Sequence, residues 1–88
     1  AYAWWHSSVA RLNRAVAVAE RDGPAAGLAL VEGIEGLHGY PWWHATRAEL
    51  LRRLGRTPEA RAAYENALAL DMSRPQAEHL IRRVAELA

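Results

Sequence analysis

Apolar residues recur along the chain at the three- and four-residue spacing of amphipathic helices, and no segment alternates like a half-buried strand. Glycine and proline divide this pattern into five stretches. The pattern therefore predicts an all-α fold. We expect helices over residues 8–22, 24–35 and 41–54, a fourth that begins at Thr57, and a fifth that begins at Ser73 and reaches Leu87.

The expected boundaries coincide with residues that start or stop helices. Gly23 and Pro24 separate the first two helices, Pro41 fits the first turn of the third, and Gly55 ends it. Polar side chains are expected as caps: Ser7 and Ser8 on the first helix, Thr57 on the fourth, and Ser73 with Gln76 in a capping box on the fifth.

Each predicted helix has one apolar face, which we expect to be buried. The five faces consist of Val9, Leu12, Val16 and Ala19; Leu28, Val31 and Ile34; Leu50, Leu51 and Leu54; Ala60, Ala63, Tyr64, Ala67 and Leu68; and Ala77, Leu80, Ile81, Val84 and Leu87. The second helix is the weakest, because Gly27 and Gly33 each lower its propensity by about 1 kcal/mol relative to alanine.

Length and composition limit what the chain can do. Its 88 residues suffice for one small domain with a thin core, in which an enclosed active site would be hard to build. There is no cysteine, hence no disulfide, no thiolate nucleophile and no cysteine metal site, and this fits a reducing, cytoplasmic location. We take the first residue, alanine rather than methionine, as a sign that the chain was cut from a longer protein or rebuilt.

Charge and hydropathy argue against two classes of partner. The formal net charge is only +1, and arginine alternates with glutamate instead of forming a basic stripe, so we expect no nucleic-acid binding. No apolar run approaches the ~20 residues of a membrane span, and no secretory signal opens the chain, so we expect no membrane association.

Two of the predicted helix pairs share one plan, with their turn glycines, Gly23 and Gly55, 32 residues apart. Solenoid repeats have this period. From Gly55 onward the chain resembles a tetratricopeptide repeat, because the turn glycine and the small and aromatic residues of the second helix match: Gly55, Ala60, Tyr64, Ala67, Leu68, Leu70 and Asp71. His44, Arg47 and Met72 depart from that pattern.

The resemblance implies a single tetratricopeptide-like domain over residues 1–88. It would consist of an extension (1–7), a degenerate helix pair (8–36), the best-matching repeat (40–71) and a capping helix (73–88). Residues 11–20 (RLNRAVAVAE), 22–24 (DGP) and 44–56 (HATRAELLRRLGR) also resemble the C-terminal extension of bacterial extracytoplasmic-function sigma factors. That resemblance implies regulation through protein contacts.

Aromatic residues are concentrated in two short clusters. Tyr2, Trp4, Trp5 and His6 form the first, and Tyr40, Trp42, Trp43 and His44 form the second, with His38 just before it. Adjacent residues on a helix lie about 100° apart, so at least one ring of each tryptophan pair should be exposed. The first helices of the two pairs should run in the same direction and bring both clusters to one end, where they would form an exposed patch.

Exposed tryptophan and tyrosine are typical of protein-binding hot spots, so we interpret these nine residues as a partner-binding patch. The alternative is that one ring of each pair seals the thin core. The histidines allow pH-sensitive binding or have no role at all. Their spacing matches no common metal motif, and no metal or other cofactor is expected.

No phosphate loop, serine elbow or tuned carboxylate pair is present, so we expect no enzymatic activity. The sequence favours a protein-binding module, either a natural sigma-factor extension or such a scaffold remodelled by selection or engineering. Self-association through the patch, or a small molecule bound between the aromatic clusters, remains an alternative. A cluster of basic residues could instead bind an acidic tail: Arg52, Arg53, Arg56 and Arg61.

Overall fold

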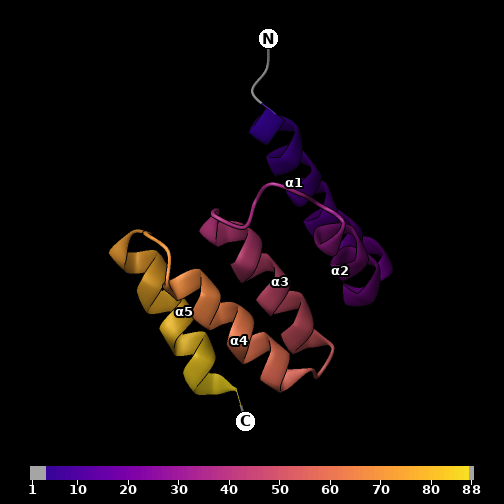
Figure 1. Ribbon diagram of the computed structural model, residues 1–88. Helices are drawn as coiled ribbons and strands as arrows, with labels where there is room; N and C mark the ends of the chain where they lie inside the picture. The colour runs from indigo at the N-terminus through magenta and orange to yellow at the C-terminus, as the bar shows by residue number, and fades with distance from the viewer. Residues whose placement is uncertain (1–3, 88) are drawn as a thin grey trace.

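Five α-helices make up the computed structural model, which describes the backbone of residues 4–87 and the side chains of residues 8–87 (Figure 1). They are α1 (Trp4–Asp22), α2 (Pro24–Glu32), α3 (Pro41–Arg53), α4 (Thr57–Leu68) and α5 (Arg74–Glu86). Over the described backbone there is no strand, so the all-α prediction is confirmed. No helix in this part of the chain is long and apolar enough to cross a membrane.

The predicted caps are correct at one helix and wrong at two. Ser73 and Gln76 form the expected capping box: the Gln76 N–H donates to the Ser73 hydroxyl at 3.4 Å, and the Ser73 N–H donates to the Gln76 side chain at 3.3 Å. The N-cap of α4 is Arg56 rather than Thr57, and no side chain caps it. Instead the Arg56 carbonyl accepts the first helical bond, from the Ala60 N–H at 2.9 Å.

The first helix starts at Trp4, four residues before the predicted start, so the expectation that Ser7 and Ser8 cap it is wrong. Ser8 is a buried residue inside α1, and its hydroxyl donates to the backbone oxygen of Glu35 at 3.3 Å. A serine that looked like a helix cap thus connects α1 to the segment that follows α2.

Gly55 ends α3 by the mechanism that the sequence suggested. Its φ of 77° lies in the left-handed region, which favours glycine. The Gly55 N–H donates to the Arg52 carbonyl and the Arg56 N–H to the Leu51 carbonyl, both at 3.0 Å. These two bonds are those of a Schellman motif, which satisfies the last carbonyls of the helix and turns the chain into α4.

The glycine that weakens α2 in isolation allows α1 and α2 to pack closely. Gly27 is buried, and a Cβ atom placed on it would lie 2.5 Å from the Ala19 Cβ and 2.9 Å from the Ala15 carbonyl oxygen. The propensity lost at Gly27 is therefore offset by contact between the two helix backbones.

The core consists of alanines and larger apolar residues, and all five helices contribute to it. Its largest fully buried side chains are Tyr64, Leu12, Leu51 and Val31. Two residues predicted to be buried are exposed, namely Val16 at 38% and Ile81 at 56%. Ala15 is buried on α1 in place of Val16, and Leu80 is the only buried residue of α5 among those described.

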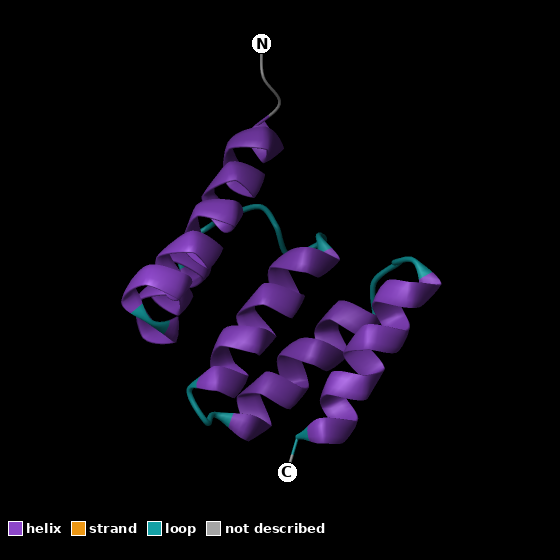
Figure 2. Cartoon of the chain, turned by 180° about the vertical axis from the view of Figure 1, so that it is seen from behind, coloured by secondary structure: helices purple, strands orange, loops and turns teal. Residues whose placement is uncertain are grey.

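The helices form two hairpins, α1–α2 and α3–α4, followed by α5, which packs on α4 (Figures 1 and 2). As predicted, α1 and α3 run in the same direction, and α5 follows that direction too (Figure 1). The molecule is flat, with extents of 43 × 30 × 17 Å. Assignment of these hairpins to the tetratricopeptide class stays a prediction.

Candidate functional site

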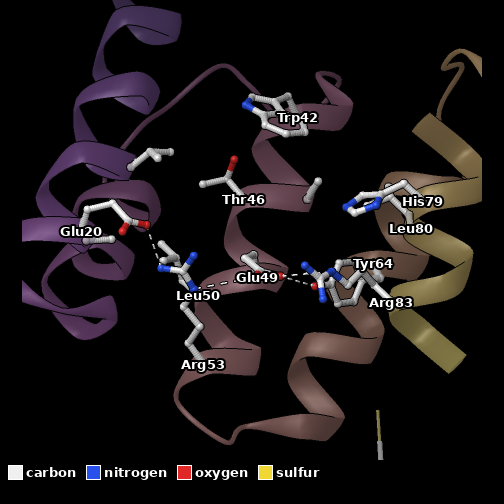
Figure 3. Close-up of a pocket in the computed structure, with 13 residues that line it drawn as sticks. Glu20, Trp42, Thr46, Glu49, Leu50, Arg53, Tyr64, His79, Leu80 and Arg83 are labelled. Atoms are coloured by element: carbon white, nitrogen blue, oxygen red, sulfur yellow. Dashed lines mark hydrogen bonds and ion pairs between the residues drawn. The ribbon is translucent and has the colours of Figure 1, made fainter. Parts of the chain in front are cut away.

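A groove runs between α1 and α5, with α3 as its floor. It consists of two adjoining hollows of about 730 Å³ and about 240 Å³. Both are lined by Trp42, Ala45, His79 and Leu80, so they form one continuous surface. We refer to the whole as the α1–α3–α5 groove. Figure 3 shows the smaller hollow, with Trp42 at its upper end and His79 reaching in from α5.

The larger hollow is mainly apolar and aromatic. Trp42 is 48% exposed and Tyr40 is 38% exposed, so both rings are open to a partner. The other lining residues are Val9 and Asn13 of α1, Pro41 and Ala45 of α3, Asp71 and Met72 of the loop before α5, and Pro75, Gln76, His79 and Leu80 of α5. An exposed tryptophan inside a hollow of this kind is the usual form of a binding hot spot.

The smaller hollow ends in a charged network around Glu49. The Glu49 carboxylate accepts hydrogen bonds from the Arg52 guanidinium at 3.1 Å and from the Tyr64 hydroxyl at 2.8 Å. It also lies 3.6 Å from the Arg53 Nε and 3.9 Å from the Arg83 Nε. The network therefore connects α3 with both α4 and α5, and Arg53 extends it to Glu20 of α1 at 3.1 Å (Figure 3).

These contacts shift the pKa values of the two central groups. The Arg52 hydrogen bond is the main reason that the pKa of Glu49 falls from 4.5 to about 2. Burial is the main reason that the pKa of Tyr64 rises from 10.0 to about 12. Glu49 is therefore ionised and Tyr64 neutral at neutral pH, which is the pair of states that their hydrogen bond requires. The network therefore connects the helices that line the smaller hollow.

Trp43 is buried, contrary to the expectation that it belongs to an exposed patch. Only 7% of it is exposed, and its indole N–H donates to the Val31 carbonyl at 3.1 Å. It packs under α2 because it lies about 100° around the helix from Trp42. The prediction that at least one ring of each pair is exposed is confirmed for this pair, and that ring is Trp42.

His44 is also buried, contrary to the predicted patch, with 9% exposure. Its Nε2 lies 2.7 Å from the backbone oxygen of His38, and its ring meets the Trp43 ring edge-on at 4.8 Å. The His38 side chain is exposed and packs edge-on against Trp43 at 4.7 Å. These two histidines therefore connect the loop between α2 and α3 to the start of α3, and neither lines the groove.

For four of the nine predicted site residues, the side chains lie outside the described part of the chain. Tyr2 and the side chains of Trp4, Trp5 and His6 lie outside the described residues. The helical backbone does extend to Trp4, so the backbone of Trp4, Trp5 and His6 is part of α1, which forms one wall of the groove. The prediction that both clusters form one patch stays a prediction.

Sequence reasoning missed the wall that α5 contributes. Asp71 was interpreted as a repeat residue and Gln76 as a capping residue, and His79 was assigned no role. The available clue was the alternation of helix direction along the chain. Helices α1, α3 and α5 run in the same direction, and all three line the groove (Figure 1). Among the described side chains, no group of three or more His, Asp or Glu residues could hold a metal ion.

Comparison with known proteins gives one informative match. The chain is 46% identical over 83 residues to an uncharacterized protein of Rhizobium meliloti (strain 1021). The match covers 93% of this chain and 20% of that protein, so the chain spans about a fifth of the relative's length. No family model matches the chain. No solved structure matches it either.

Proposed function

We propose that this chain is a non-enzymatic protein-binding module whose contact surface is the α1–α3–α5 groove. The observation that carries the proposal is the position of Trp42, which is 48% exposed and lines both hollows of the groove. A large rigid ring in a concave apolar surface gains much contact area at small entropic cost when a partner covers it.

The shape of the groove favours a polypeptide partner over a small molecule. Its larger hollow has a volume typical of ligand pockets, but it lies open between three helices and continues into a second hollow. On α1 the groove is lined by residues between Val9 and Glu20. At 1.5 Å per residue, this stretch of helix is about 16 Å long. A path of that length suits a segment of chain better than a compact metabolite.

We also propose that the module acts as part of a longer protein and regulates it through this contact. The relative from Rhizobium meliloti supports this proposal, since a segment similar to nearly the whole chain makes up only 20% of it. The runs at residues 11–20, 22–24 and 44–56, which resemble the sigma-factor extension, suggest that the regulated activity is transcription. If the chain is instead a remodelled form of such a natural scaffold, its binding surface would be the same groove around Trp42.

Selection from a random peptide library tests the proposal without a known partner. The immobilised chain is used to select 16-residue peptides from a phage library, and their affinities are then measured by fluorescence polarisation. We expect selected peptides to bind the Trp42→Ala variant at least about tenfold more weakly than the parent chain. Because Trp42 is half exposed, the variant should fold, which circular dichroism checks.

The matched control is Ile81→Ala on α5, which removes an exposed apolar side chain that does not line the groove. Peptides bound in the groove should not distinguish this variant from the parent chain. If the library yields no binders, or if binders are insensitive to Trp42→Ala, the groove is not a polypeptide-binding site and the proposal is wrong.

A further inference from the structure

The length of the groove suits a short extended segment. About five residues of a polyproline II segment, at 3.1 Å each, span the path of about 16 Å that α1 lines. An α-helix would need about three turns to cover the same path.

Trp42, Tyr40 and two prolines line the larger hollow. Tyr40, Pro41 and Trp42 follow one another at the start of α3, and Pro75 of α5 lines the same hollow. Grooves lined with exposed aromatic rings accept proline-containing segments, whose flat rings pack on the aromatic faces and whose rigid backbone loses little entropy on binding.

The groove also carries donors for the backbone carbonyls of such a segment, which have no internal hydrogen bonds. Within the described residues, the indole N–H of Trp42 and the Asn13 amide form no hydrogen bond. Gln76 uses its side-chain oxygen in the capping box, which leaves its amide N–H groups available. These three donors come from α3, α1 and α5, so they surround the path of the chain.

Charge then distinguishes among extended segments. Asp71 is the only carboxylate that lines the larger hollow, which no arginine lines, and in the described part of the chain it forms no ion pair. The charged residues of the smaller hollow are already paired with one another, Glu20 with Arg53 and Glu49 with Arg83. The unpaired charge in the groove is therefore negative, and it complements a basic residue.

From these observations we infer that the groove binds an extended, proline-containing segment with an arginine or lysine that pairs with Asp71. The inference rests on the proposed function and specifies its partner class. In the complex, proline or other apolar residues cover Trp42 and Tyr40. The basic residue lies at the end of the larger hollow where the chain enters α5.

Synthetic peptides test this inference directly. The probes are fluorescein-labelled seven-residue peptides of six prolines with one terminal arginine, made with the arginine at either end because the direction of binding is open. Two comparison peptides replace the arginine with glutamate or place it in an alanine-rich helical sequence. We expect the better arginine probe to bind at least about fivefold more tightly than either comparison peptide.

Two variants, each with a matched control, separate the contributions of Asp71 and Trp42. Asp71→Asn should remove the preference for arginine over glutamate, whereas Glu65→Gln, at an exposed residue of α4 outside the groove, should leave it unchanged. Trp42→Ala should weaken both proline peptides alike, and Ile81→Ala should weaken neither. Tighter binding of the helical peptide, or an arginine preference that survives Asp71→Asn, would overturn the inference.

The library selection distinguishes failure of this inference from failure of the proposed function. If the library yields peptides that depend on Trp42 but are acidic or helical, the groove is a protein-binding site and only the inferred partner class is wrong. If neither the proline probes nor the library yields binding that depends on Trp42, both proposals fail.

Discussion

Replacing Glu49 with glutamine should make the stability of the protein less dependent on acid. The substitution keeps the size of the side chain but removes the charge that Arg52, Arg53 and Arg83 surround. The pKa of Glu49 is lowered from 4.5 in an ordinary environment to about 2, mainly by the Arg52 hydrogen bond. A shift of that size corresponds to about 3 kcal/mol, and solvent screening of a side chain that is 26% exposed reduces it to about 1–2 kcal/mol.

The sign follows from linkage between protonation and folding. A carboxyl group whose pKa is lower in the folded state stabilises the fold above its unfolded pKa, and the contribution disappears as the pH falls toward the folded pKa. Glu49 should therefore contribute fully above about pH 4.5 and almost nothing near pH 2. At pH 7 the Glu49→Gln variant should be less stable than the parent chain by about 1–2 kcal/mol, and the two should converge between pH 4.5 and pH 2.

Urea unfolding, followed by circular dichroism at several pH values between 7 and 2.5, measures this difference. A loss of 1–2 kcal/mol lowers the midpoint by about 1 M urea at the m-value of a small domain. Glu65→Gln is the control, because Glu65 is exposed on α4 and forms no ion pair among the described residues. A stability difference for Glu49→Gln that stays constant from pH 7 to pH 2.5 would show that the network does not act through the charge of Glu49.

Three further predictions, the first with a matched control, concern the packing and capping that position the groove, and urea unfolding at pH 7 tests each of them. Gly27→Ala should destabilise by about 1–3 kcal/mol despite its better helix propensity, because its Cβ would lie 2.5 Å from that of Ala19, whereas Gly33→Ala has no contact closer than 3.6 Å and should be neutral or stabilising. Equal effects at the two glycines would refute the close-packing argument. Trp43→Phe should cost about 1–2 kcal/mol through loss of its hydrogen bond and of ring volume, and a neutral result would contradict its burial under α2. Ser73→Ala should cost about 1 kcal/mol by removing the capping box, and an unchanged midpoint would mean that α5 does not need this cap.

Helix boundaries were predictable where backbone chemistry alone decides them. Gly55 and the Ser73–Gln76 pair act locally, through a positive φ and through hydrogen bonds within four residues, and the structure has both as expected. Ser8 and Thr57 look like caps in the sequence but are not, since α1 continues back to Trp4 and the α4 cap falls one residue earlier, at Arg56. A distant partner, the Glu35 carbonyl, accounts for Ser8, and no local pattern contains it.

For the candidate site, sequence reasoning identified the aromatic cluster after Pro41 but not the role of each member. Helix geometry requires Trp42 and Trp43 to face different ways, yet it does not say which one is exposed. The position of α2 decides this, because its Val31 carbonyl accepts the indole N–H of Trp43. His79 and Asp71 line the groove only because α5 packs on α4 and so lines the same hollow as α3, which is about 30 residues earlier in the sequence.

The sequence by itself determined that the chain is helical, where most of its turns lie and that one tryptophan of the second pair must face outward, since these follow from propensity, glycine geometry and the 100° step of a helix. Only the tertiary structure decided that Trp42 lies in a groove between α1, α3 and α5. It also decided that His44 contacts the loop before α3 and that Gly27 lies at the close contact between α1 and α2. Those properties depend on which helices meet, and that is set by packing between residues distant in sequence.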